Sequence, residues 1–418
     1  MMGGRVIPGP FILLIPISEN VQLRRIRLEA NKTLGICLAL SLLSLSGCFK
    51  QESSPTGPTT ISSFKSSYIP TKREYWITTE TSFKWDMVPG GEAMMTNDSI
   101  TPERRYLYKT IRYVQTDSQW NKVAQPEWQQ LSGPIIRATV GDSVLVHFKN
   151  GANTGMPLSI HPHNLFYDEA NEGVWRKDRP KEWPAQGTAG GSVQPGYEFL
   201  YHWKAEEKSV GVGPYHSHSF HPAEELSLGL IGTVIVDQPP DHPEYVKFDT
   251  TIALVFKTYL AMVSPMDTTV KDSTKKDTCT APLIPWNGGC HPREHVPQDQ
   301  WPENIVDSLA HGGGPEVHTI NGIAYANLKG LSFMKGQNIR FVVVAMDDEG
   351  TQNHTIHFHG EMLQEMTRTN LYKDVFDLPS AVAIDLIMKA ENVGKWMLHC
   401  HVEHHASEMM ATYEIKAP

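Results

Sequence analysis

The sequence predicts an all-β protein built from two similar Greek-key β-sandwich domains. Three observations lead to this prediction. Short apolar runs with alternating or β-branched residues recur along the chain, whereas long amphipathic helical patterns are scarce. Turn signals separate these runs at short intervals, as in antiparallel sandwiches. A set of motifs in the first half also returns in the same order in the second half, which indicates a duplicated domain.

The first 48 residues have the pattern of an export signal. Four basic residues within 24–32 precede an apolar run, 33–47, that is shorter than the ~20 residues of a membrane-spanning helix. The run ends at Cys48 in a Leu-Ser-Gly-Cys sequence, which resembles the lipobox of bacterial lipoproteins. A generic signal peptide or an N-terminal membrane anchor is the alternative. We therefore expect an exported chain whose Cys48 carries a lipid anchor in the bacterial cell envelope, at the outer membrane or its periplasmic face.

The segment that follows is expected to be a flexible tether. Residues 49–75 are rich in Ser, Thr and Pro and show little periodicity, which is typical of a linker between an anchor and a folded body. Beyond it, we expect one domain over residues 76–240 and a second over residues 241–418, joined near Asp237-Gln238-Pro239-Pro240.

The internal repeat supports this division. Each half contains, in order, a glycine turn that opens a strand, two His-x-His motifs and a closing apolar strand. In the first half these are Gly141, His161-Pro162-His163, His216-Ser217-His218 and residues 230–236. In the second half they are Gly336, His357-Phe358-His359, His399-Cys400-His401 and residues 410–415.

One polar, proline-containing stretch, residues 268–314, interrupts the second half. It contains Cys279 and Cys290, eleven positions apart, which in an exported loop predicts a local disulfide. A metal site formed with His291 and His295 is the alternative.

Composition narrows the functional classes. The chain has 37 basic and 46 acidic residues and a formal net charge of -9, so we expect no nucleic acid partner. It has 19 histidines and five cysteines. That is too few cysteines for a disulfide scaffold of this length, whereas many imidazoles with few thiolates suit a metalloprotein.

Strand geometry indicates that the histidine motifs can form metal sites. Residues i and i+2 of a strand share a face, so each His-x-His motif directs two imidazoles to one place. Cys400 lies between His399 and His401 and points to the opposite face, so one strand can present a thiolate to one metal and two imidazoles to another. A Cys, two His and a distant Met form the ligand set of a blue-copper centre, which His354, Cys400, His405 and Met410 can supply. A zinc site is complete with four ligands and would leave the other histidines unused. Eight histidines of the His-x-His motifs remain, which is enough for a cluster of several ions.

These motifs resemble those of multicopper oxidases. The pattern H-x-x-H-x-H at residues 354–359 and the pattern H-C-H-x-x-x-H-x-x-x-x-M at residues 399–410 match that family position for position, and the resemblance extends over roughly residues 80–418. It implies cupredoxin-like domains and four copper ions per chain. The type 1 copper would be bound by His354, Cys400, His405 and axial Met410, since the family spacing favours Met410 over Met409. The type 2 copper would be bound by His161 and His357, and the type 3 pair by His163, His216, His218, His359, His399 and His401.

Departures from the family pattern are also informative. The first half has Ser217 where the second has Cys400, so no type 1 copper is expected there. With its type 1 site in the second of two domains, the chain is similar to two-domain laccases, which implies a homotrimer with the trinuclear cluster between subunits. Copper nitrite reductases carry their Cys in the first domain and lack the H-C-H motif, which argues against that function.

The resemblance implies an enzyme that takes single electrons from a small reducing substrate at the type 1 copper and reduces O2 to water at the cluster. We expect a laccase-like substrate such as a phenol, with Fe(II) or Cu(I) oxidation, or a non-catalytic copper-binding lipoprotein, as alternatives. The exposed edge of the type 1 site is expected at His405.

Alignment with two-domain laccases adds three candidate catalytic residues. It places Glu172 and Asp374 as proton-relay acids and Tyr167 as a redox-active tyrosine; ordinary surface acids and a packing tyrosine are the alternatives. His404 is expected to face solvent or support the site, and His318 to be structural.

Overall fold

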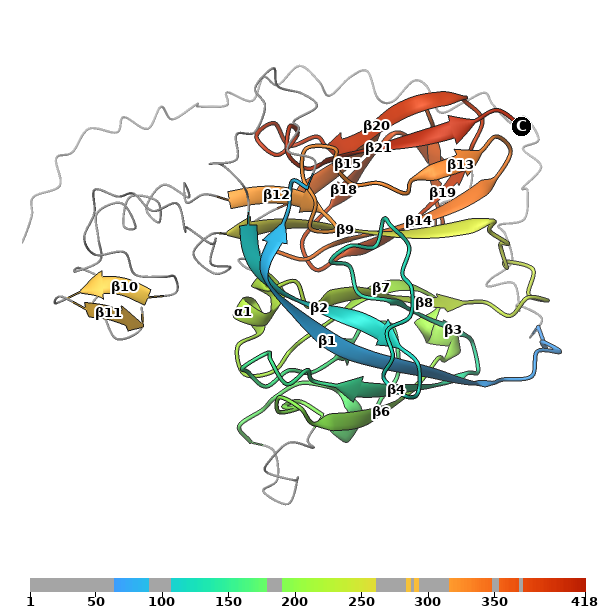
Figure 1. Cartoon of the computed structure of the whole chain (residues 1–418). Helices are drawn as coiled ribbons and strands as arrows, with labels where there is room; N and C mark the ends of the chain where they lie inside the picture. Colours follow the sequence, from blue (N-terminus) through green and yellow to red (C-terminus); the bar gives the residue numbers. More distant parts are fainter. Residues whose placement is uncertain are drawn as a thin grey trace, which may run out of the picture. The chain divides into compact units, whose positions relative to one another are not determined.

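Two β-sandwiches make up the folded body, which confirms the predicted all-β class (Figure 1). The computed structural model describes residues 64–89, 107–178, 190–260, 283–286, 289–292, 316–347, 353–367 and 371–418. The expected signal segment 1–48, with Cys48, and most of the expected tether lie outside these residues. Among the described residues, no helix has the length and apolar character needed to span a membrane.

The first sandwich packs two four-stranded sheets against each other. One sheet has the order β2 (Leu107–Thr116), β1 (Lys72–Asp86), β4 (Ser143–Lys149) and β6 (Glu198–Lys204). The other has the order β3 (Ile135–Thr139), β8 (Ile231–Asp237), β7 (Gly211–His216) and β5 (His161–Pro162). Short helical turns lie between the strands: η2 (Glu169–Asn171), η3 (Glu207–Ser209) and α1 (Pro222–Ser227). Alternate residues of β4, such as Val144, Val146 and Phe148, are fully buried between the sheets, as their period-two pattern predicts.

The folded body begins earlier than the expected end of the tether at residue 75. Lys72 already pairs with Ser143, and the parallel pairing of β1 with β4 continues from there. The buried Asp142 carboxylate holds the chain just before this point, because it accepts hydrogen bonds from Thr71 N–H at 2.7 Å and from Arg73 Nε at 2.8 Å. These partners are some 70 residues away in sequence, so local composition does not reveal them.

The second sandwich repeats the plan with larger sheets. One has the order β12 (Glu316–Ile320), β9 (Thr250–Leu260), β14 (Asn338–Ala345), β19 (Ala383–Lys389), β16 (Leu363–Glu365) and β17 (Tyr372–Lys373). The other has the order β13 (Ser332–Met334), β21 (Met410–Lys416), β20 (Gly394–Cys400), β15 (His354–Phe358) and β18 (Val375–Leu378). β10 (Leu283–Trp286) and β11 (Gly289–Pro292) form an antiparallel hairpin. The expected Cys279–Cys290 disulfide lies outside the described side chains and stays a prediction.

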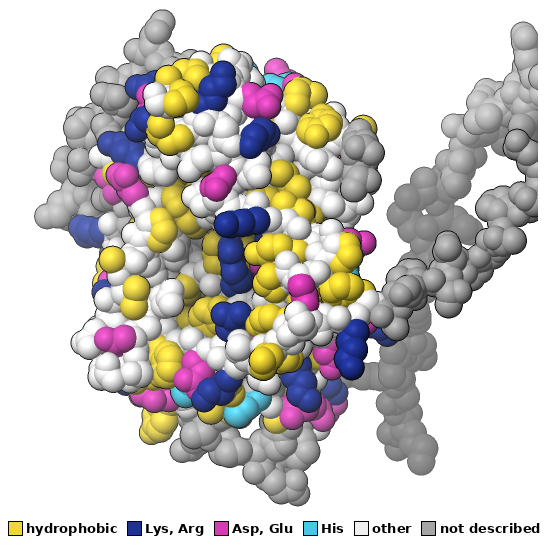
Figure 2. All heavy atoms as spheres, turned by 90° about the vertical axis from the view of Figure 1, so that its right-hand side faces the viewer, with side chains coloured by type: hydrophobic (Ala, Val, Ile, Leu, Met, Phe, Trp, Pro, Cys, Tyr) yellow, Lys and Arg dark blue, Asp and Glu magenta, His cyan; other side chains and the backbone are white. Residues whose placement is uncertain are grey.

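The two sandwiches are joined by apolar and ionic contacts. Trp85, near the end of β1, donates a hydrogen bond from Nε1 to the Gly322 carbonyl of the second sandwich at 3.0 Å. The buried Arg340 of β14 forms ion pairs with Asp385 of β19 and with Asp237 at the end of β8. Figure 2 shows a face of the molecule on which basic, acidic and apolar side chains are mixed.

Candidate metal centres

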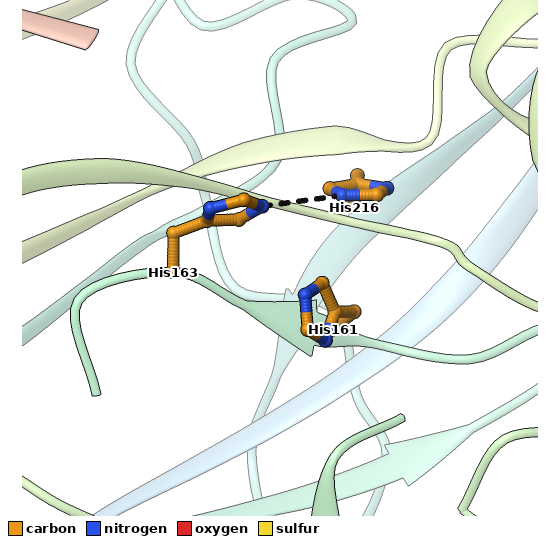
Figure 3. A group of neighbouring side chains, drawn as sticks. All are labelled: His161, His163 and His216. Atoms are coloured by element: carbon orange, nitrogen blue, oxygen red, sulfur yellow. Dashed lines mark hydrogen bonds between the residues drawn. The ribbon is translucent and has the colours of Figure 1, made fainter. Parts of the chain in front are cut away.

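One group of histidines lies where β5 and β7 meet in the first sandwich. His161 and His216 are directly paired in antiparallel register, and their ring centroids are 5.4 Å apart. His163 Nε2 lies 3.4 Å from His216 Nε2, and the ring of His218 lies 5.6 Å from that of His161. Figure 3 shows the facing nitrogens of His163 and His216, with the ring of His161 beside them. Four imidazoles therefore gather at one place.

The second sandwich has the same arrangement where β15 and β20 meet. His357 and His399 are directly paired, with ring centroids 5.5 Å apart. His359 Nε2 lies 3.1 Å from His399 Nε2, and the rings of His357 and His401 are 5.5 Å apart. The two halves thus carry two equivalent groups of four histidines, which we call the first and second half-clusters.

Backbone carbonyls orient the equivalent rings in both half-clusters. His161 Nδ1 donates to the Glu172 carbonyl at 2.7 Å, and His357 Nδ1 donates to the Asp374 carbonyl at 3.1 Å. His216 and His399 each donate to the carbonyl of the next residue, at 2.9 and 2.7 Å. Because Nδ1 carries the proton, the Nε2 lone pair of each ring is free for a metal.

The protonation states also suit metal binding. Burial and the neighbouring histidines lower the pKa of His163 to about 4 and that of His216 to about 3. Both rings are therefore neutral at pH 7, so protons do not compete with a metal for their lone pairs. Two neutral nitrogens that face each other at 3.4 Å are suited to share an ion. The half-clusters fit copper in this respect.

The three expected catalytic residues lie beside the half-clusters. Glu172 and Asp374 occupy equivalent places in the two half-clusters. The Glu172 backbone carbonyl accepts a hydrogen bond from His161, and the Asp374 backbone carbonyl accepts one from His357. Asp374 Oδ2 lies 3.8 Å from His357 Nδ1, and the Tyr167 ring lies 5.9 Å from that of His161. Their roles in proton or electron transfer stay predictions.

A third group, His354, Cys400 and His405, is buried in the second sandwich. Cys400 Sγ lies 3.7 Å from His354 Nδ1 and 3.6 Å from His405 Nδ1. Cys400 packs into the core between the sheets, whereas His401 is exposed, so the strand directs the thiol and the imidazoles to opposite faces. His405 Nε2 is buried without a hydrogen-bond partner. The three ligand atoms suit a trigonal copper site, which we call the type 1 pocket.

Sequence reasoning missed one member of this pocket, Asp347. Its Oδ2 lies 2.8 Å from His354 Nε2, and its Oδ1 accepts the Thr258 N–H at 2.8 Å. Burial alone lowers the pKa of His354, but hydrogen bonds with Asp347 and Cys400 outweigh it and raise this pKa to about 9. The pocket therefore stabilises positive charge. A carboxylate is a common outer partner of a metal-binding histidine, so an acid shortly before His354 was the available signal.

The expectation of an exposed edge at His405 is wrong. The side chain is 2% exposed, because His318 stacks on its ring at 3.9 Å and His404 covers it at 4.3 Å. His404 itself is exposed. His318, which is itself 3% exposed, is thus part of the wall of the pocket, and the exposed His404 lies on another side of the His405 ring.

The expected axial ligand, Met410, is buried at the first position of β21, where it pairs with His399 at the end of β20. Its role as a ligand of the type 1 copper stays a prediction.

Comparison with known proteins agrees with this geometry. Residues 128–241 and 299–417 each match a family described as multicopper oxidase, one region in each sandwich. The chain belongs to the multicopper oxidase family. Its two matched regions are cupredoxin-type domains of that family.

Curated relatives of this multicopper oxidase are longer proteins. Ceruloplasmin of Rattus norvegicus is 28% identical over 369 residues, which cover 83% of this chain and 32% of the relative. Ferroxidase HEPHL1 of Mus musculus is 26% identical over 362 residues, which cover 79% of this chain and 28% of the relative. The chain therefore spans about a third of the length of these relatives.

Solved structures share the fold. The multicopper oxidase mgLAC has a TM-score of 0.52 at 18% identity and covers 82% of this chain and 86% of its own. A copper nitrite reductase from Nitrosomonas europaea has a TM-score of 0.52 at 14% identity and covers 83% of this chain and 94% of its own. Both share the fold of this chain.

In this multicopper oxidase, the first sandwich fills the place of a type 1 site with a hydrogen-bond network. Ser217, at the position of Cys400, donates its hydroxyl to Glu225 Oε2 at 2.6 Å. The same carboxylate accepts the Ser219 N–H at 2.8 Å and the His221 N–H at 3.0 Å. Leu158 stands three residues before His161, where His354 stands before His357. This half therefore has a hydroxyl and a leucine where copper would need a thiolate and an imidazole.

Proposed function

We propose that this chain is an oxidase that takes single electrons from a reducing substrate at the type 1 pocket and reduces O2 to water at a cluster of three copper ions. Four copper ions per chain would be held by the type 1 pocket and by the eight histidines of the half-clusters. One observation carries the proposal: the end of β20 supplies Cys400 to the pocket and His399 to the second half-cluster, and His401, which directly follows β20, belongs to the same half-cluster. Storage of copper alone does not require two sites on opposite faces of one strand.

Copper, when bound, supplies one-electron redox chemistry and a site for O2. The chain supplies the connection between the type 1 pocket and the second half-cluster. Cys400 and His399 are adjacent, and His399 Nδ1 donates to the Cys400 carbonyl at 2.7 Å, so a covalent path and a hydrogen bond link the two sites. The reaction balances when four substrate molecules each lose one electron and O2 takes up four electrons and four protons to give two waters. Glu172 and Asp374, whose backbone carbonyls contact His161 and His357, are the acids that we propose to deliver those protons.

The two half-clusters support a cluster closed between subunits. Among the described residues, no hydrogen bond or ring contact joins a histidine of the first half-cluster to one of the second. Each half alone offers four imidazoles, whereas the cluster needs all eight. We therefore propose a homotrimer in which the first sandwich of one subunit meets the second sandwich of another. A monomer in light scattering that still binds four copper ions would refute this assembly.

For the electron donor, the burial of His405 favours a metal ion over a phenol. A phenol donor would have to contact the edge of a ligand ring, and this edge is covered by His318 and His404. Relatives that carry the name ferroxidase point in the same direction. Fe(II) is therefore the donor that we propose, and Cu(I) and a laccase-type phenol are the alternatives.

Oxygen uptake by copper-loaded protein tests the function. We expect rates with Fe(II) to exceed those with a phenol, and the uptake to approach one O2 per four Fe(II). A faster rate with the phenol would favour a laccase. No uptake with Fe(II), Cu(I) or a phenol would overturn the oxidase.

Export and lipid attachment at Cys48 are part of the proposal on the basis of the N-terminal sequence pattern. Metabolic labelling with a radioactive fatty acid should mark the full-length chain and not its Cys48→Ser variant. Equal labelling of both chains would refute the anchor.

A further inference from the structure

We propose that Trp175 and Phe220 form an aromatic anchor by which the first sandwich of one subunit binds the second sandwich of another copy of this chain. This inference rests on the proposed function, because it concerns the contact that would close the copper cluster between subunits. It assigns that contact to two exposed side chains that are not copper ligands.

Exposed aromatic side chains flank the first half-cluster. Trp175 and Phe220 are 36% and 43% exposed, and their ring centroids are 4.2 Å apart. Phe220 follows His218 by two residues, and the Trp175 N–H donates to the His218 carbonyl at 3.0 Å. The exposed Tyr167 ring lies 5.9 Å from that of His161. Large apolar rings gathered on a surface are typical of a protein-binding site.

The backbone that carries Trp175 is held on two sides. Val174 forms a parallel bridge with His218 of the half-cluster. On its other side, Val174 lies so close to Gly191 that a Cβ on this glycine would be 2.3 Å from the Val174 carbonyl oxygen. A side chain that is already fixed loses little conformational entropy on binding, and Trp is enriched among the residues that dominate binding energy. The pair is therefore suited to anchor an interface.

The half-cluster beside the anchor indicates which partner binds there. It holds four imidazoles, and the proposed cluster needs the four of the second half-cluster as well. A protein that covers this face and completes the cluster must bring those four histidines. The second sandwich of another copy of this chain carries them, so the occupant that we propose is a second copy.

The second half-cluster has exposed apolar side chains of its own, which are Met362, Leu371 and Tyr372. Met362 follows His359 by three residues. Tyr372 precedes Asp374 by two residues, and the Asp374 carbonyl accepts the hydrogen bond from His357 Nδ1. A flexible thioether packs favourably against aromatic rings. These side chains therefore suit the surface that Trp175 and Phe220 present.

Light scattering coupled to size exclusion, over a dilution series of copper-loaded protein, tests the anchor. The parent chain should be a trimer. The double variant Trp175→Ser, Phe220→Ser should dissociate at a protein concentration at least about tenfold higher than the parent. Tyr197→Ser is the matched control, because Tyr197 is also exposed but directly precedes β6, in the sheet of the first sandwich that lacks the half-cluster. It should leave the dissociation concentration unchanged.

A second experiment identifies the partner face directly. Phe220 is replaced by the photoreactive residue p-benzoylphenylalanine, and ¹⁴N- and ¹⁵N-labelled chains are mixed so that links between copies are distinguished by mass spectrometry. Irradiation should link residue 220 of one copy to a peptide of another copy that contains Met362 or Tyr372. Links between copies to other regions, or links within one chain only, would overturn the inference.

Circular dichroism and the blue absorption of the type 1 pocket, which lies within one sandwich, separate dissociation from unfolding. Both should persist in the dissociated double variant; if either is lost, the cross-linking result decides. A double variant that stays trimeric at the parent's concentrations, or equal dissociation of Tyr197→Ser, would overturn the anchor alone. A parent chain that is monomeric and still binds four copper ions would instead refute the assembly in the proposed function, so the two failures are distinguishable.

Discussion

Substitution of Arg340 by methionine tests a buried ion-pair network that lies within the second sandwich and reaches the first at Asp237. The Arg340 guanidinium binds Asp385 with Nε at 2.9 Å and with Nη2 at 2.6 Å, and its Nη1 binds Asp237 at 2.6 Å. The side chains of Arg340 and Asp385 are 2% and 7% exposed. Methionine removes the charge and retains much of the apolar stem.

The size of the effect follows from this burial. Removal of one partner of a buried ion pair costs about 3–5 kcal/mol, because the other charge stays buried without compensation. We expect Arg340→Met to lower the free energy of unfolding by about 3 kcal/mol, at the lower end of that range, since Asp237 is 21% exposed and water can reach it. Asp237→Asn removes only this more exposed pair and should cost about 1 kcal/mol or less.

Urea unfolding of the copper-free protein at pH 7, followed by circular dichroism, measures these values. The double variant Arg340→Met, Asp385→Leu removes both buried charges and should recover most of the lost stability. A loss below 1 kcal/mol for Arg340→Met, or a double variant as unstable as the single one, would refute the reasoning.

Three further predictions concern the pocket and the acid response. Cys400→Ser should abolish intense blue absorption while the half-clusters still bind copper; retained blue colour would contradict the assignment. Burial raises the pKa of Asp142, but hydrogen bonds from Arg73 and Thr71 outweigh it and hold this pKa below its ordinary 3.8. The ionised Asp142 carboxylate therefore stabilises the folded protein above pH 3.8, and this stabilisation is lost as the pH falls through the pKa of Asp142 in the folded protein. Asp142→Asn should cost about 1–3 kcal/mol at pH 7 and weaken the acid dependence of unfolding below pH 4; an unchanged acid profile would contradict this. Removal of copper by a chelator should lower the melting temperature, and copper addition should restore it, because the metal binds the folded chain; equal melting temperatures would argue against assembled sites.

The fold and most of the metal sites could be predicted because their signals are local. His161 and His163 share a motif, and strand alternation alone places their rings together and Cys400 apart from His399. The duplication then indicated two half-clusters without any knowledge of tertiary contacts.

Other features depend on contacts between distant segments. The burial of His405 requires His318, which β12 brings from 87 positions earlier in the chain. Asp347 becomes part of the pocket only because its carboxylate reaches His354 and the Thr258 backbone of β9. The start of the folded body at Lys72 depends on pairing with Ser143.

The amino-acid sequence by itself determined the kinds of ligand, their grouping and the family, because spacing along a strand decides which side chains share a face. Only the tertiary structure decided how the type 1 pocket is enclosed. Asp347 contacts His354 and His318 stacks on His405, and both contacts depend on how distant segments of the second sandwich pack together.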